Sequence, residues 1–183
     1  MHTMKKEIIG QWVVPTIIIA FAVAGRLLPH PANVAPVGAI AFFAGLYLPK
    51  RWALIAPLVV MFISDIFIGF YNPFMMLFVY GGFVVMGYIG LRVRTHKTVI
   101  NTIGGVVMGS SLFFLLTNWS VWAFGTMYTK TFSGLLQSYI MAIPFFRNSM
   151  IGDVFFVVVL CAIAELSLAI TQSRSRRVAS RTA

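Results

Sequence analysis

Long apolar stretches alternate along the chain with short segments that hold proline, glycine and charged residues. Most of these stretches carry no charge or a single one, and about 20 apolar residues in a helix are enough to cross the hydrocarbon layer of a membrane. The pattern therefore predicts an all-α membrane protein with six transmembrane helices. Their expected bounds are Ile8 to Leu28, Val34 to Leu48, Trp52 to Tyr71, Phe74 to Leu91, Val99 to about Asn118, and Met150 to Ile170.

The connection between the last two predicted helices, residues 119–148, is longer than a turn requires. It contains several aromatic residues, a short polar stretch, and an apolar piece from Leu135 to Phe146 that is too short to span a membrane. A piece of this length is typical of an interfacial or re-entrant segment. We therefore expect an outer cap over the bundle. Residues 1–171 form one transmembrane domain in this interpretation, and residues 172–183 form a basic, disordered cytoplasmic tail.

The composition excludes a water-soluble fold, because 60% of the residues are hydrophobic and only 10% are charged, against about 25% in an average soluble domain. The net charge of +10 would suggest a nucleic-acid partner in a soluble protein. Here the basic residues lie between and beyond the apolar stretches, where they act as topology signals and contact phosphate headgroups. The lipid bilayer is therefore the expected partner, and nucleic acid is not.

The distribution of the 14 basic residues sets the expected orientation. Cytoplasmic loops of membrane proteins carry an excess of lysine and arginine. Eleven of them fall on one side of the predicted layout: Lys5, Lys6, Lys50, Arg51, Arg92, Arg94, Lys97, Arg174, Arg176, Arg177 and Arg181. Only Arg26, Lys130 and Arg147 fall on the other. We expect both termini in the cytoplasm.

Polar residues collect toward the predicted outer face, beginning with the segment RLLPHPANVAP at residues 26–36. Asp65 lies six residues before the end of the third predicted helix, about 9 Å below the outer surface. A charge within the membrane costs about 3 kcal/mol, so Asp65 needs a partner such as Arg26, Lys130 or Arg147. The candidate ligand-binding residues are Arg26, His30, Asn33, Asp65, Tyr71, Asn118, Trp122, Arg147, Asn148 and Asp153. Two interpretations stay open: a structural ion pair between helices, or an outward-facing pocket.

Motifs for catalysis and metal binding are missing from the sequence. His30 stands apart from the other two histidines, which lie on the predicted cytoplasmic side, whereas a metal site needs several such ligands. No serine has a histidine at a spacing that indicates a nucleophile and its base, and there is no phosphate-binding loop of the Walker type. We expect no metal, no cofactor and no enzymatic activity.

Small residues are spaced at helical intervals on two of the predicted helices. Ala20 and Ala24 have the spacing that lets membrane helices approach closely, and Gly104, Gly105 and Gly109 provide a second such face. Two interpretations apply to these faces. They pack within the bundle, or they form a docking surface for a partner subunit.

Five segments together resemble an uncharacterised family of small bacterial integral membrane proteins. They are RLLPHPANVAPVGAIAFFAG at 26–45, MFISDIFIGFY at 61–71, VYGGF at 79–83, TNWSVW at 117–122 and AIPFFRNSMIGDVFF at 142–156. That family is in turn distantly similar to the substrate-binding (S) components of energy-coupling-factor vitamin transporters.

The resemblance implies a function that the residues alone do not specify. S components are six-helix proteins that capture a vitamin or metal ion from outside and dock, through small residues of the first helix, on a transmembrane coupling subunit driven by two ATPases. It implies that this chain captures a small vitamin-like molecule at the bacterial cytoplasmic membrane and docks through Ala20 and Ala24. Two alternatives remain. One is a membrane-embedded enzyme acting on lipid, with Asp65, His30 and Asp153 in acid–base roles; the other is a structural or assembly protein without a ligand.

Overall fold

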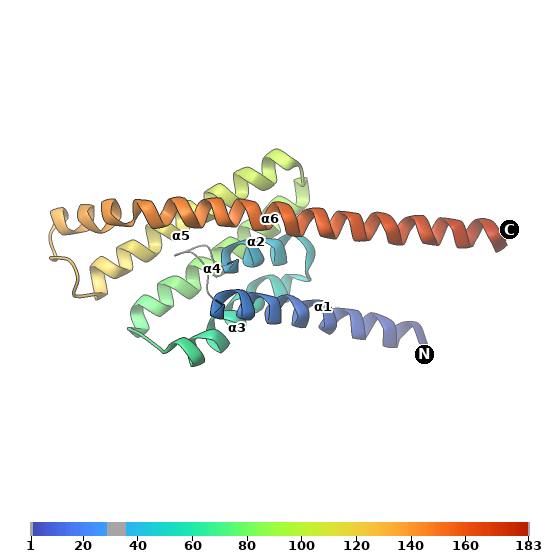
Figure 1. The fold of residues 1–183 in the computed structure, drawn as a ribbon, viewed down its shortest axis with the longest axis horizontal. Coiled ribbons are helices and arrows are strands. Elements are labelled where there is room, and N and C mark those ends of the chain that lie inside the picture. Colours follow the sequence, from blue (N-terminus) through green and yellow to red (C-terminus); the bar gives the residue numbers. More distant parts are fainter. Residues whose placement is uncertain (1, 29–35, 183) are drawn as a thin grey trace.

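The computed structural model describes the backbone of residues 2–28 and 36–182, and the side chains of residues 15–28, 36–170 and 173. Within these ranges every regular element is helical, as the apolar stretches predicted (Figure 1). The elements are α1 (His2–Leu27), α2 (Val37–Tyr47), α3 (Lys50–Ile68), α4 (Pro73–Val93), the 3₁₀ turn η1 (Arg94–His96), α5 (Val99–Phe124) and α6 (Phe132–Thr182).

Two ends of the bundle serve as landmarks. The connection between α5 and α6, residues 125–131, lies beside the connection between α3 and α4, because the Asn72 side-chain amide donates to the carbonyl of Phe124 at 3.2 Å. We call this the hairpin end. The opposite end, which holds η1, is called the η1 end, and there α1 and α6 run on beyond the rest of the bundle (Figure 1).

Four helices are long and apolar enough to cross a membrane. They are α3, α4 together with η1, α5, and the Phe132–Ile170 part of α6. Large apolar side chains stand exposed on their outer surfaces, among them Phe67, Leu77, Leu112, Phe155 and Leu166. In water such a surface would be an aggregation hazard, whereas in a bilayer it contacts lipid. These helices indicate a multi-pass membrane protein.

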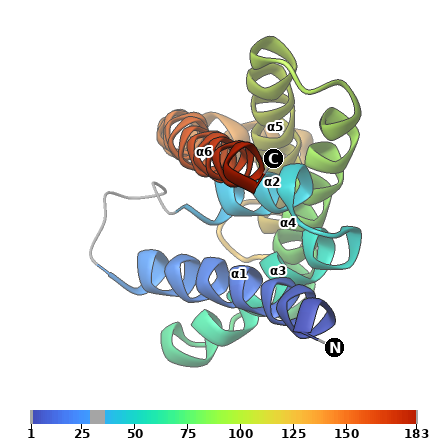
Figure 2. The same cartoon turned by 90° about the vertical axis from the view of Figure 1, so that its right-hand side faces the viewer.

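Helix α2 is different, since it lies at the centre of the bundle (Figure 2). Every residue from Val37 to Leu46 is buried, which explains why this helix is apolar on all sides. Its 11 residues extend about 16 Å, only about half of the hydrocarbon thickness. The prediction that this segment is a transmembrane span was therefore wrong: α2 is a buried half-length helix.

Glycines allow α2 to lie directly against α4. A Cβ atom on Gly90 would collide with the backbone carbonyl of Phe42, and one on Gly45 would collide with the backbone carbonyl of Gly87. On its other side, Gly87 faces the carbonyl of Ala53 in α3. Backbone therefore touches backbone at this three-helix junction, which no residue with a side chain permits without a shift.

Helices α5 and α6 form a long antiparallel hairpin. Phe114 stacks on Phe146 with ring centroids 4.4 Å apart, and the Tyr139 hydroxyl donates to the carbonyl of Leu115 at 2.9 Å. The predicted outer cap was wrong, because Leu135 to Phe146 is the first part of α6 and packs along α5. These aromatic and hydrogen-bonding contacts, with Pro144 accommodated inside the helix, keep the segment in line with the rest of α6.

The length of α6 also departs from the sequence prediction. Its apolar part, Phe132–Ile170, has 39 residues, or about 58 Å of helix, against about 30 Å of hydrocarbon. Tilts rarely exceed about 40°, so part of the hairpin must project beyond the hydrocarbon layer. The helix then continues to Thr182, so the structure gives residues 172–182 helical backbone where a disordered tail was predicted.

Candidate functional site

An ion pair connects α1 to α3 inside the bundle. Arg26 Nη1 lies 2.7 Å from Asp65 Oδ1, and the exposed fractions of the two side chains are 18% and 1%. The same nitrogen donates to the Ser64 hydroxyl. Of the three cations that the sequence offered as partners for Asp65, the structure selects Arg26, which lies at the end of α1 where it can reach α3.

The other carboxylate oxygen of Asp65 is held from α4. The Tyr80 hydroxyl donates to Asp65 Oδ2 at 2.6 Å, so one carboxylate joins three helices. Tyr71, in the connection that follows α3, lies near both charges. The partial burial of its ring raises the pKa of its phenol, Asp65 raises it further, and Arg26 lowers it. Asp65 therefore has a cationic partner at Oδ1 and a hydrogen-bond donor at Oδ2.

A second carboxylate, Asp153 of α6, lies at the start of α2. The Ser110 hydroxyl of α5 donates to Asp153 Oδ2 at 2.7 Å, and the carboxylate lies close to the backbone N–H of Ala39. The first N–H groups of a helix have no partner within the helix, and the helix dipole favours a negative charge at that place. Asp153 thus supplies from α6 the cap that Pro36, at the N-cap position of α2, does not provide.

Gly38 makes this arrangement possible. A Cβ atom at this position would lie 2.5 Å from Asp153 Oδ1 and 2.9 Å from the carboxylate carbon. The carboxylate consequently rests directly on the first turn of α2. A side chain at position 38 would push it away from Ser110 and Ala39.

We expect Gly38→Ala to lower the free energy of unfolding by about 1–3 kcal/mol, the usual range for overpacking in a core. Unfolding of purified protein in detergent would measure the loss. Gly104→Ala is the matched control, because a Cβ atom there meets nothing within 4 Å; it should be neutral or slightly stabilising. Equal effects of the two substitutions would contradict the close contact at Gly38.

Two adjoining cavities meet at Asp153. The hairpin cavity, between α5 and α6, has a volume of about 220 Å³, and the bundle cavity, which reaches α1–α4, has a volume of about 200 Å³. Both are partly open, and both are lined by Phe113, Ser149 and Asp153. Each is smaller than the about 300 Å³ at which ligand pockets usually begin, but together they reach that size.

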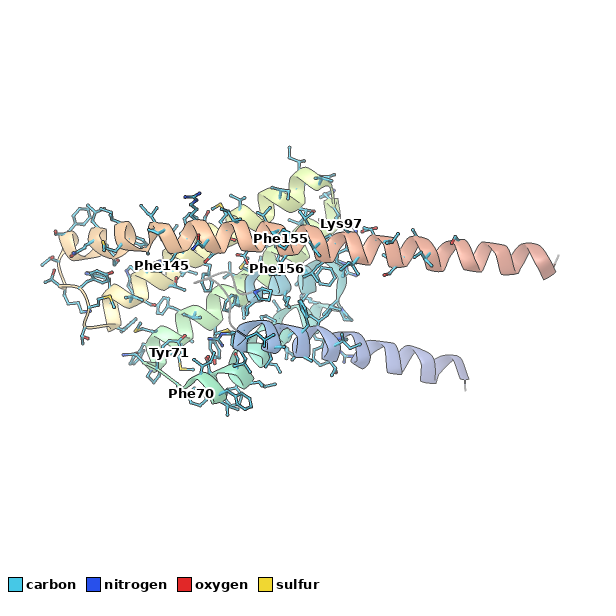
Figure 3. The ribbon with its side chains drawn as sticks, in the orientation of Figure 1. Phe70, Tyr71, Lys97, Phe145, Phe155 and Phe156 are labelled. Atoms are coloured by element: carbon cyan, nitrogen blue, oxygen red, sulfur yellow. The ribbon has the colours of Figure 1, made fainter. Side chains whose placement is uncertain are left out.

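The lining of the cavities combines opposite charges with aromatic walls. Arg26 and Asp153 both line the bundle cavity. The hairpin cavity is bounded by phenylalanines and by four uncharged polar residues, namely Phe113, Phe114, Phe145, Phe146, Ser110, Thr117, Asn118 and Ser149. Figure 3 shows Phe145 and Tyr71 toward the hairpin end. A guanidinium donates hydrogen bonds only and a carboxylate accepts them, so the site suits a molecule with both kinds of polar group.

Comparison with protein families gives one match, over residues 6–176. The chain belongs to DUF6580, a family of unknown function. Comparison with curated proteins gives no match, and comparison with solved structures gives none either. The expected membership of an uncharacterised family is therefore confirmed for DUF6580. The more distant likeness to S components stays a hypothesis.

The DUF6580 chain brings only some of the predicted site residues together. Arg26, Asn118 and Asp153 line the cavities, and Asp65 forms an ion pair with Arg26. Arg147 does not join them: its side chain is exposed on α6, so the predicted pairing with Asp65 is not found. His30 and Asn33 lie outside the described residues.

The remaining predicted residues lie around the hairpin end of the DUF6580 chain. The Trp122 indole donates to the carbonyl of Thr129 at 3.0 Å, Lys130 donates to the carbonyls of Trp122 and Gly125, and Tyr71 is exposed. Asn148 is half-buried next to the cavity residue Ser149. Trp122 and Lys130 therefore close the end of α5, and neither lines the two cavities.

Sequence reasoning missed several residues of the site. Ser110, Ser149, Tyr80 and Gly38 were not among the candidate site residues, and Ser110 is 43 positions away from the carboxylate it contacts. One signal was present: Ser110 lies in an otherwise apolar predicted helix, and a hydroxyl buried there needs a partner. That signal marks a residue as interesting but does not say which helix it faces.

Ala20 and Ala24 of the DUF6580 chain are exposed, whereas Ala22 between them is fully buried against the core. The two alanines therefore present a small-residue face that the described part of the bundle does not use for internal packing. Of the predicted glycines on α5, Gly105 packs against Val93 and Phe42 of the bundle, and Gly104 is open.

Proposed function

We propose that this chain is a membrane protein that binds a small polar molecule in the two adjoining cavities. The observation that carries the proposal is that Arg26 and Asp153 line one cavity with opposite charges while Phe113, Ser149 and Asp153 connect it to the aromatic one. Arg26 and Asp153 each have a partner within the bundle, but a guanidinium has more donors, and a carboxylate more acceptor positions, than these contacts use. A ligand with an acceptor for Arg26, a donor for Asp153 and a flat apolar part for the phenylalanines would satisfy the site.

The distribution of basic residues supports an orientation for this binding. Arg92, Arg94 and Lys97 lie at or beside η1, so the positive-inside rule places the η1 end in the cytoplasm and the hairpin end outside. The half-length helix α2 then begins near the middle of the membrane and points its N-terminus at the cavities, as broken helices do at the binding sites of transporters. Within this proposal the chain captures its ligand from outside, in the manner of an S component, and Ala20 and Ala24 contact a coupling subunit.

Ligand binding can be tested with purified protein and a panel of vitamins and other small heteroaromatic molecules. We expect at least one compound to raise the melting temperature in a concentration-dependent manner. Ser149→Leu should abolish that shift, because Ser149 lines both cavities. Ser133→Leu, at an exposed position of the same helix, is the matched control and should bind normally.

Other outcomes favour the alternatives. If no compound shifts the melting temperature and Ser149→Leu raises stability by filling an empty space, the polar residues are interhelical contacts of a structural protein. Turnover of a labelled lipid that disappears in Asp153→Asn would instead favour a membrane-embedded enzyme.

A further inference from the structure

A groove lies at the η1 end, away from the two cavities, between α4, η1 and α5. Its volume is about 510 Å³. Its walls are apolar and include Ile89, Val93, Ile100 and Met108. Gly104 lines it at a point where a Cβ atom would meet nothing within 4 Å, so the helix backbone itself is open to an occupant.

One end of the groove is basic. Arg92 Nε donates to the Tyr88 hydroxyl at 2.7 Å, and the guanidinium carbon lies 5.1 Å from the centroid of the Tyr88 ring. These contacts fix the guanidinium at the rim, where His96 and Asn101 also line the groove. No carboxylate is among the lining residues, and across the described ranges Arg92 forms no ion pair. Glu165, an acidic residue of α6, is paired with Lys97, which Figure 3 places toward the same end.

We propose that this groove binds one anionic phospholipid. The phosphate group lies at Arg92, and an acyl chain runs over Gly104 toward Met108. Two features favour a lipid over a soluble anion: the groove is mostly apolar, and Ile100 and Met108 in its walls are 80% and 51% exposed, which only a hydrocarbon chain would cover. The charge of Arg92 without a carboxylate favours an anionic headgroup over a zwitterionic one, as in other basic pockets between membrane helices.

The test uses full-length, delipidated protein in detergent, titrated with phosphatidylglycerol or phosphatidylcholine, with bound lipid counted by native mass spectrometry. We expect phosphatidylglycerol to be retained in several-fold excess. Arg92→Gln should weaken its binding roughly fivefold, which corresponds to one basic residue near a membrane surface, and should weaken phosphatidylcholine binding less. Arg147→Gln removes the same charge from an exposed position on α6 and should have no effect.

A second variant tests the acyl-chain part. Gly104→Leu should lower binding of both lipids, since leucine fills the groove at a place where the fold has room. The proposal is overturned if both lipids bind equally, or if Arg147→Gln weakens binding as much as Arg92→Gln. It is also overturned if glycerol phosphate displaces the lipid and Gly104→Leu has no effect, because the site would then hold a soluble anion.

Discussion

Replacing Asp65 with leucine is expected to lower the free energy of unfolding by about 3–5 kcal/mol, the usual cost of removing one partner from a buried ion pair. Asp65 is fully buried, accepts from Tyr80 and is paired with Arg26. Without it, the guanidinium keeps its charge in the cavity wall, where its remaining hydrogen bonds among the described residues go to the Ser64 hydroxyl and the Met61 carbonyl. Unfolding in mixed detergent micelles would measure the loss.

The double variant Arg26→Met/Asp65→Leu is the control for this prediction. It removes both charges and should recover most of the lost stability, because buried pairs replaced by apolar residues are often neutral. A single variant as stable as the wild type would contradict the structural role of the pair. The double variant also distinguishes a loss of stability from a loss of binding. It should fold, but the ligand should not raise its melting temperature, since Arg26 lines the bundle cavity.

Replacing Gly90 with alanine is expected to lower the free energy of unfolding by about 2–3 kcal/mol, at the upper end for overpacking. The added Cβ collides with the backbone carbonyl of Phe42 and also approaches Gly45. Backbone cannot rotate away as a side chain can, so α2 would have to move from α4. Thermal unfolding of the purified protein would show the loss as a lower melting temperature.

Gly81→Ala is the matched control, because it lies on the same helix and a Cβ there meets nothing within 4 Å. It should be neutral or stabilising by up to about 1 kcal/mol, the difference in helix propensity between the two residues. If Gly90→Ala behaves in the same way, the close approach of α2 and α4 does not contribute to stability.

Hydropathy predicted where helices form, because a backbone in an apolar surrounding must satisfy its own hydrogen bonds. Each of the six predicted stretches overlaps one of the six helices, but α6 begins at Phe132 rather than at Met150. Hydropathy did not distinguish α2 from a transmembrane helix. A helix surrounded by lipid and a helix buried in protein both need apolar side chains, so their sequences look alike. The structure adds the deciding fact, because the 11 helical residues of α2 are too few to cross the membrane.

Because an unpaired charge in a membrane is costly, the sequence predicted a partner for Asp65. The expected depth of Asp65 reduced the possible partners to three cations. Only the structure could choose Arg26, because the choice depends on which face of α1 meets α3. The same uncertainty explains Arg147. Arg147 is two positions before the cavity residue Ser149 on α6, but its side chain is exposed.

By itself, the sequence determined an all-helical membrane protein with a need for charge pairing near one end, because both follow from the transfer of single residues between water and an apolar phase. The tertiary structure decided that α2 is buried at the centre, that Leu135 to Phe146 continues α6, and that Asp153 caps α2 beside two cavities. Those features depend on contacts between residues far apart in the chain, such as Ser110 with Asp153 and Phe42 with Gly90. Hydropathy predicts how deep in the membrane a residue lies, whereas tertiary packing determines which residues it contacts.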